Sequence, residues 1–306
     1  MRSRLPILVA VAVVTAALAG AFMSSSQAAP NDSDAPEVKV GKAHPEEAVH
    51  LRVLTDNRPI FVLAMGDNYR EPFEKSHLTD SIHLIGINPA KKQASIVGFP
   101  RDSYVEIPGH GRSKINNAMA FGGPSLAVET VEHLTGIRIN YYAVTTFEGF
   151  KTIVSGLKGL PVKIPYTIND KSSHARLKKG LQTLTGKEAL AFARSRYDVP
   201  NGDFSRSENQ GIILMAFLDK LRTQFERDPS SIFEFIGLGL HNANTDVPLD
   251  ELLDLAFTVV EIQPNKVTNQ VVPGSIATAD GLSIVKISPA ANKIYKTMKG
   301  DGLVGR

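Results

Sequence analysis

The sequence predicts an α/β protein built as a three-layer α/β/α sandwich with a central mixed β-sheet. Strand-like apolar runs alternate with helical patterns along residues 53 to 306, which is typical of a sheet covered by helices on both faces. The first three runs are joined by short connections, and short connections favour antiparallel neighbours. Because later runs are separated by helical patterns, we expect a mixed sheet.

The N-terminus predicts export. Arg2 and Arg4 precede an apolar stretch over residues 5–23, and a basic start before such a stretch keeps the N-terminus inside while the rest crosses. The stretch is close to the ~20 residues that span a bilayer. We favour a retained membrane anchor over residues 1–29, with a signal peptide cleaved near Ala28 as the alternative. Residues 30–52 are polar and contain proline, and they are typical of a flexible linker.

Composition excludes several classes of protein. The chain has no cysteine, so disulfides, thiolate nucleophiles and Cys-bound zinc are excluded. The formal net charge is only +3, which gives no indication of a nucleic-acid partner. No histidine pair has metal-ligand spacing, and neither a P-loop nor a Gly-x-Ser-x-Gly elbow is present.

Three predicted strands cover residues 60–65, 81–87 and 94–99. If they form an up-down-up meander, the end of the first, the start of the second and the end of the third share one rim of the sheet. Those places hold Asp67, Asp80 and the pair Arg101-Asp102.

The remaining elements follow in chain order. We expect a helix that opens at Gly122-Gly123-Pro124 and closes at Gly136. Capping boxes at Thr185 and Ser205 each predict a helix start. A strand over 139–144, a helix over 147–157, a helix over 249–260 and a strand over 267–272 complete the pattern.

Asp67 and Asp80 are the candidate metal ligands. Mg²⁺ is commonly held by one or two carboxylates together with phosphate oxygens and water, and the shared rim would supply that pair. The alternative is that Asp67 caps a turn and Asp80 is a solvated residue at the start of a strand.

Arg194 and Arg196 are candidate phosphate ligands. If the chain is extended just beyond the preceding helix, side chains two residues apart point the same way, so both guanidiniums could face one anion. A solvated basic turn is the alternative. With Ser205 as N-cap, Arg206 would lie in the first turn of a helix and Gln210 one turn later on the same face. An ordinary capped amphipathic helix would have the same pattern.

The sequence resembles the LytR–CpsA–Psr family of bacterial envelope proteins. The matching blocks run in family order across residues 58 to 225 and include Gly66-Asp67, Thr79-Asp80-Ser81, Phe99-Pro100-Arg101-Asp102, Lys114-Ile115-Asn116, Phe121-Gly122-Gly123, Leu134-Thr135-Gly136-Ile137, Phe147-Glu148-Gly149-Phe150, Arg194-Ser195-Arg196 and Gly202-Asp203-Phe204-Ser205-Arg206.

The resemblance implies a hydrophobic pocket for a polyprenyl chain, with a pyrophosphate and Mg²⁺ or Mn²⁺ at its mouth. It implies transfer of a glycopolymer with its phosphate from a polyprenyl-pyrophosphate carrier to peptidoglycan, at the membrane. By position, Asp67 and Asp80 correspond to metal-associated carboxylates and Asp203 to a residue that orients an arginine. The pyrophosphate ligands would be Arg101, Arg194, Arg196, Arg206 and Gln210.

The chain departs from the family pattern at the head group. Leu78 and Asn209 stand where the family often has arginine, and Arg70 would replace an arginine usually closer to Asp67. Two other functions use the same site: hydrolysis of a polyprenyl pyrophosphate, and non-catalytic binding of lipid phosphates with a regulatory effect.

Overall fold

The computed structural model describes residues 57–69 and 77–305, all of which belong to one compact unit. The predicted anchor or signal peptide over residues 1–29 and the linker over 30–52 lie outside the described residues, as does Arg70. Within the described part of the chain, no helix has the length and apolar character needed to span a bilayer.

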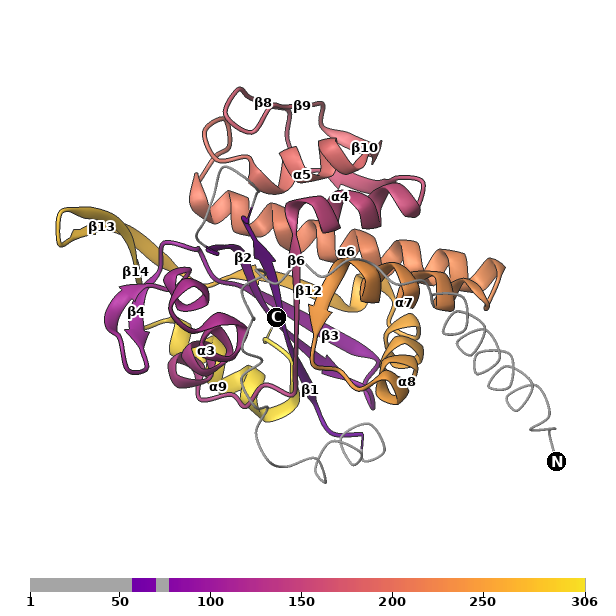
Figure 1. The fold of residues 1–306 in the computed structure, drawn as a ribbon, viewed down its shortest axis with the longest axis horizontal. Coiled ribbons are helices and arrows are strands. Elements are labelled where there is room, and N and C mark those ends of the chain that lie inside the picture. The colour runs from indigo at the N-terminus through magenta and orange to yellow at the C-terminus, as the bar shows by residue number, and fades with distance from the viewer. Residues whose placement is uncertain (1–56, 70–76, 306) are drawn as a thin grey trace, which may run out of the picture. The chain divides into compact units, whose positions relative to one another are not determined.

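A six-stranded mixed sheet forms the centre of the unit (Figure 1). Its strand order is β11-β6-β1-β2-β3-β12. The bounds are β1 Ile60–Asp67, β2 Thr79–Asn88, β3 Gln93–Gly98, β6 Tyr141–Thr146, β11 Ala243–Thr245 and β12 Val267–Val271. β1, β2 and β3 pair antiparallel, whereas β6 is parallel to β1 and β12 is parallel to β3. The predicted meander and the predicted mixed sheet are both confirmed.

Helices cover both faces of this sheet, as alternation along β1 requires. Phe61, Leu63 and Met65 pack in one apolar cluster with α3 (Asn117–Thr135) and α9 (Ala291–Asp301). The intervening residues Ile60 and Val62 pack on the opposite face with α6 (Asp203–Arg227) and α8 (Leu249–Val260). Successive strand side chains point to opposite faces, so the sheet is buried between two helical layers and the three-layer prediction is confirmed.

A further apolar cluster is built beside the sheet from α4 (Phe147–Gly156), α5 (Gly186–Arg194) and the first half of α6. Small hairpins and a further helix complete the unit, and the sequence patterns did not predict them. They are β4 Tyr104–Ile107 with β5 Gly111–Lys114, β7 Leu160–Ile164 with β10 Gly180–Leu184, β8 Ile168–Asp170 with β9 Ala175–Leu177, β13 Gly274–Ala279 with β14 Leu282–Ile287, and α7 Ser231–Asn242.

Two helix starts differ from the predictions. α3 begins at Asn117 and is kinked at Gly122 and Gly123, so the glycines and Pro124 interrupt a helix where we expected them to open one. α6 begins at Asp203, two residues before the predicted cap. Gly202 has a φ of +53°, a conformation that glycine adopts without steric cost.

Candidate active site

The predicted rim exists. In the pairing of β1 with β2, Gly66 lies opposite Ser81 and Asp67 opposite Thr79. The register shift between them leaves Asp80 as the extra residue of a β-bulge, a feature that commonly re-aims a side chain at functional sites. Arg101 and Asp102 follow the end of β3. The ends of three neighbouring strands therefore bring these four charged side chains to one edge of the sheet.

Asp67 and Asp80 have different partners. Asp67 is 5% exposed; its Oδ1 accepts a hydrogen bond from the Tyr69 amide at 2.9 Å, and its Oδ2 lies 2.5 Å from Nδ1 of His77. The His77 ring stacks on Tyr69 with 4.3 Å between the ring centroids. Asp80 instead accepts a hydrogen bond from Arg101 Nη1 through its Oδ1. One carboxylate is held by a histidine and the other by a guanidinium.

This pair fits a hard divalent cation only together with a ligand. Among the described residues, no group of three or more histidine, aspartate or glutamate side chains could hold a metal ion. Mg²⁺ nevertheless needs only one or two carboxylates when phosphate oxygens and water supply the other positions. Asp67 and Asp80 have the right chemistry for that arrangement, and their role as metal ligands stays a prediction.

Three guanidiniums gather around two buried carboxylates beside this rim. Arg206 forms an ion pair with Asp203, and both side chains are nearly buried. Arg196 lies between the acids, with Nε 3.9 Å from Asp203 Oδ1 and Nη2 4.0 Å from Asp102 Oδ2. We call Arg101, Arg196 and Arg206, with Asp102 and Asp203, the arginine cluster.

Electrostatics within the arginine cluster are tightly coupled. Burial lowers the pKa of Arg206, and the nearby guanidiniums of Arg101 and Arg196 act in the same direction, against the carboxylate of Asp203. Burial also acts to lower the pKa of Arg101, but Asp80, Asp102 and Asp203 outweigh it and raise that pKa. Nε of Arg101 is buried and has no hydrogen-bond partner among the described residues, so the cluster has an unused donor for an oxyanion.

Arg194 and Arg196 contact different neighbours, although the chain at Ser195 is extended as the sequence analysis required. Arg194 ends α5, and its guanidinium lies 4.9 Å from the centroid of the Phe147 ring. Asp170 fixes the following residues, because its Oδ2 accepts hydrogen bonds from the backbone amides of Arg196 at 2.7 Å and Tyr197 at 3.1 Å. The two side chains therefore have different protein contacts, and the binding of one anion by both guanidiniums stays a prediction.

Gln210 connects the rim to α5. Its Nε2 donates to the backbone carbonyls of Asp80 and Ala193, both at 3.0 Å. Arg206, in the second turn of α6 because of the early helix start, points back to Asp203. The predicted first-turn position of Arg206 is wrong, as is the Ser205 cap: the Ser205 hydroxyl accepts instead from the Asn201 amide at 3.1 Å.

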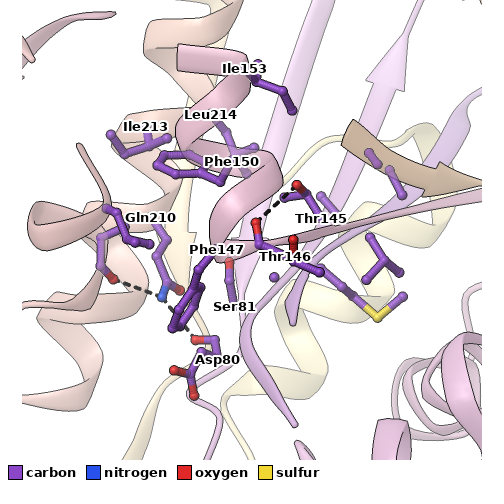
Figure 2. A pocket seen from close by; sticks show the side chains of 18 of the residues that line it. Asp80, Ser81, Thr145, Thr146, Phe147, Phe150, Ile153, Gln210, Ile213 and Leu214 are labelled. Atoms are coloured by element: carbon purple, nitrogen blue, oxygen red, sulfur yellow. Dashed lines mark hydrogen bonds between the residues drawn. The ribbon is translucent and has the colours of Figure 1, made fainter. Parts of the chain in front are cut away.

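An apolar cavity of about 220 Å³ opens beside these residues. Figure 2 shows Asp80 and Gln210 at one end of it, with Phe147 next to them and the apolar side chains of Phe150, Ile213 and Leu214 beyond. The full lining is Ala64, Met65, Gly66, Asp80, Ser81, Ala143, Val144, Thr145, Thr146, Phe147, Phe150, Ile153, Leu190, Ala193, Arg194, Gln210, Ile213, Leu214, Phe217 and Ala243. A cavity with an apolar wall and a charged end fits an amphiphile with an anionic head group.

The sequence analysis missed two contributors to the site. Lys114 was given no role of its own, yet its Nζ lies 2.9 Å from Asp102 Oδ1. Asp170 carried no pattern that set it apart from other loop acids. For Lys114, the available indication was its place in the block Lys114-Ile115-Asn116. Asp170 could not be found this way, because its partners lie 26 and 27 residues later.

Comparison with known proteins gives consistent matches. A profile of the LytR_cpsA_psr family matches residues 22–300. The polyisoprenyl-teichoic acid–peptidoglycan teichoic acid transferase TagU of Bacillus mycoides is 32% identical over 246 residues, which cover 80% of this chain and 79% of TagU. The crystal structure of B. subtilis TagV matches with a TM-score of 0.69 and 27% identity, covering 82% of this chain and 99% of TagV. A structure of TagT bound to LI-WTA matches with a TM-score of 0.66 and 26% identity, covering 80% and 91% of the two chains.

Proposed function

The chain belongs to the LytR–CpsA–Psr family, and from this premise we propose that it is a glycopolymer–peptidoglycan phosphotransferase. It moves a glycopolymer, with its phosphate, from a polyprenyl-pyrophosphate carrier to peptidoglycan. The named transferase from B. mycoides, which aligns over most of both chains, supports this activity and its teichoic acid substrate class. The TagT structure with LI-WTA supports a wall-polymer precursor as donor.

One observation carries the proposal: the apolar cavity opens where the arginine cluster begins. Asp80 lines the cavity and accepts a hydrogen bond from Arg101, which belongs to the cluster. Arg194 and Gln210 line the same cavity. A polyprenyl pyrophosphate that carries a glycopolymer has this combination of a long apolar chain and a compact dianionic head group. No water-soluble phosphate ester would need the apolar half of the site.

The transfer is a displacement at phosphorus. The oxygen of an acceptor hydroxyl bonds to the phosphorus that carries the glycopolymer, and the bond from that phosphorus to the bridging oxygen breaks. The polyprenyl phosphate departs with the electron pair, and the hydroxyl proton passes to the carboxylate of Asp80 or Asp67. Arg101, Arg196 and Arg206 act by stabilising negative charge on the phosphoryl oxygens and on the departing phosphate.

Asp102 and Asp203 keep those guanidiniums oriented, since each acid contacts at least one of them. Mg²⁺ or Mn²⁺ would be held by Asp67 and Asp80 and, when bound, would neutralise pyrophosphate charge. Asp80 also accepts a hydrogen bond from Arg101, so this carboxylate would connect the metal site to the arginine cluster.

We also propose that the enzyme works outside the cytoplasmic membrane, held by residues 1–29. Peptidoglycan is assembled there, where ATP is absent, and an activated pyrophosphate supplies the free energy for transfer. Mass spectrometry of the mature N-terminus distinguishes a retained anchor from a cleaved signal.

A reconstituted reaction tests the activity. Full-length chain in detergent micelles is incubated with Mg²⁺, a short-chain polyprenyl pyrophosphate disaccharide and a peptidoglycan oligosaccharide. We expect disaccharide phosphate on the acceptor and release of polyprenyl phosphate. Release of disaccharide phosphate without acceptor product would instead indicate a hydrolase, and donor binding without turnover would indicate a non-catalytic lipid-phosphate-binding protein.

A further inference from the structure

A second cavity, of about 280 Å³, lies against the arginine cluster and shares no lining residue with the apolar cavity. Asp102, Arg196 and Asp203 line it on one side, and Ile276 and Val285 of the β13–β14 hairpin line it on the other. Arg101 interacts electrostatically with Asp80, which lines the first cavity, and with Asp102 and Asp203, which line the second. The arginine cluster therefore adjoins both cavities.

The wall formed by the hairpin is fixed to the site. The amide of Val285 donates to the carbonyl of Asp102 at 2.8 Å, and Val285 pairs with Ser103 in a short parallel bridge. At the tip of the hairpin, the Tyr104 hydroxyl donates to Asp280 Oδ2 at 2.8 Å. The hairpin, which projects beside β4 in Figure 1, is thus attached to the segment that directly follows Arg101.

The chemistry of this second cavity is amphipathic. Tyr197 is 73% exposed and Ile276 is 71% exposed, and both line the cavity next to the carboxylates of Asp102 and Asp203. Large exposed apolar side chains that gather at a depression indicate a binding surface. An aromatic ring and an aliphatic chain beside hydrogen-bond acceptors suit a sugar ring, which has apolar C–H faces and hydroxyls at its edge.

The in-line geometry of the reaction indicates which substrate this sugar belongs to. In phosphoryl transfer, the attacking and leaving oxygens lie roughly in line through phosphorus. The polyprenyl chain in the apolar cavity puts the leaving phosphate on that side of the arginine cluster, so the attacking hydroxyl arrives from the other side. The second cavity, which Arg196 and Asp203 line, is available to the acceptor on that side.

We propose that the cavity between Tyr197 and the β13–β14 hairpin binds the peptidoglycan sugar that carries the attacking hydroxyl. This assignment rests on the proposed transferase function. The first sugar of the donor has the same chemistry. The test therefore asks whether substitutions in this cavity raise the KM for the acceptor or the KM for the donor.

The test compares steady-state kinetics of the full-length chain in micelles, varying the acceptor oligosaccharide at saturating donor and then the reverse. Tyr197→Ala and Ile276→Ser are the variants. We expect each to raise the KM for the acceptor by about tenfold, as loss of one stacking or apolar contact predicts, with the effect confined to the acceptor. Tyr197→Phe retains the ring and should recover most of the loss.

The controls address folding and the neighbouring arginine. Leu181→Ala removes an equally exposed apolar side chain, 75% exposed on β10, and should leave both KM values unchanged. The guanidinium of Arg196 lies 5.7 Å from the Tyr197 ring centroid, whereas Ile276 lies on the opposite wall, so agreement between the two variants excludes an effect through Arg196.

An unchanged acceptor KM in both variants, or a rise in the donor KM alone, overturns the assignment. These outcomes are distinguishable from failure of the proposed function itself, because in that case the unmodified chain transfers nothing to the acceptor.

Discussion

The two halves of α6 differ in which kind of side chain they bury. In its first two turns, polar side chains are buried, among them Asp203, Arg206, Asn209 and Gln210. From Leu214 to Phe225, apolar side chains including Phe217 stay only partly buried. Core helices usually bury apolar residues and expose polar ones.

Function explains both halves. A buried guanidinium is costly unless a carboxylate and hydrogen bonds compensate it, and Asp203 supplies that compensation for Arg206. Leu214 and Phe217 remain accessible because they line the apolar cavity. One helix therefore contributes to the head-group site at its start and to the apolar wall further along, which fixes the position of one relative to the other.

The largest effect on stability and activity is expected from Arg206→Met, which removes the buried ion pair with Asp203 in the first half of α6. It removes the close partner of the buried Asp203 carboxylate and leaves only the more distant guanidiniums of Arg196 and Arg101. We therefore expect a loss of about 3 kcal/mol in the free energy of unfolding and a fall of at least ~10³-fold in transfer rate. Urea denaturation followed by circular dichroism and the transfer assay measure the two effects. In the double variant Asp203→Asn/Arg206→Met, stability should largely return while activity should not; recovered activity would contradict a role in head-group binding.

A second prediction concerns His83, which packs against the start of α6. Its Nε2 lies 3.0 Å from the Ser207 carbonyl, and burial lowers the pKa of His83 to about 4 from 6.5. The unfolded chain therefore takes up a proton at higher pH than the folded chain does. The stability contribution is complete above about pH 6.5 and is lost as pH falls towards 4, by roughly 3 kcal/mol in total.

Urea denaturation at pH 7 and pH 4 measures this loss, and His83→Gln provides the comparison because its amide replaces the hydrogen bond without titrating. We expect the variant to lose less stability on acidification than the unmodified chain. Equal losses in both would show that acidification acts elsewhere in the fold.

A third prediction tests whether the apolar cavity binds the polyprenyl chain. Ile153 of α4 lines the cavity, and Ile153→Trp should fill part of it. We expect the KM for a long-chain polyprenyl donor to rise about tenfold, with a smaller effect on a donor that has only a few isoprene units. Ile153→Leu keeps the volume and serves as the matched control. An equal rise for both donors would argue against this cavity as the chain-binding site.

The smallest effect is expected from Arg222→Met, on the same helix as Arg206. Arg222 pairs with Glu226 one turn away, and the Glu226 side chain is 55% exposed. Exposed pairs of this spacing contribute about 0.3–0.5 kcal/mol, so stability and transfer rate should change little. A loss comparable to that of Arg206→Met would remove the distinction between the two halves.

Local sequence patterns were sufficient for the rim and for every strand of the central sheet except β11, which no pattern predicted. Alternation and short turns identified β1 to β3, so Asp67, Asp80 and Arg101 could be placed together before any coordinates. The capping box at Thr185 is present, with Glu188 completing it. The family resemblance then placed Arg194, Arg196, Asp203, Arg206 and Gln210 near the same site.

What could not be predicted depends on single backbone conformations or on distant packing. Ser205 and Glu208 match the capping-box pattern, but the positive φ of Gly202 starts α6 earlier and turns Arg206 towards Asp203. The second cavity requires the β13–β14 hairpin to pair with Ser103, 182 residues away from Val285. No local periodicity encodes such a contact.

The C-terminal segment has a consequence for how this protein reaches its native state. β12 adds the outer strand next to β3, the Asn88 side chain donates to the Asp301 carbonyl at 2.8 Å, and the Val304 amide donates to the Ser95 hydroxyl at 2.9 Å. The two hydrogen bonds join residues more than 200 positions apart, and long-range closure of this kind slows folding. Until β12 has docked, β3 has an open edge that invites pairing with other chains, so the chain is most exposed to aggregation before residues 267–271 reach the sheet.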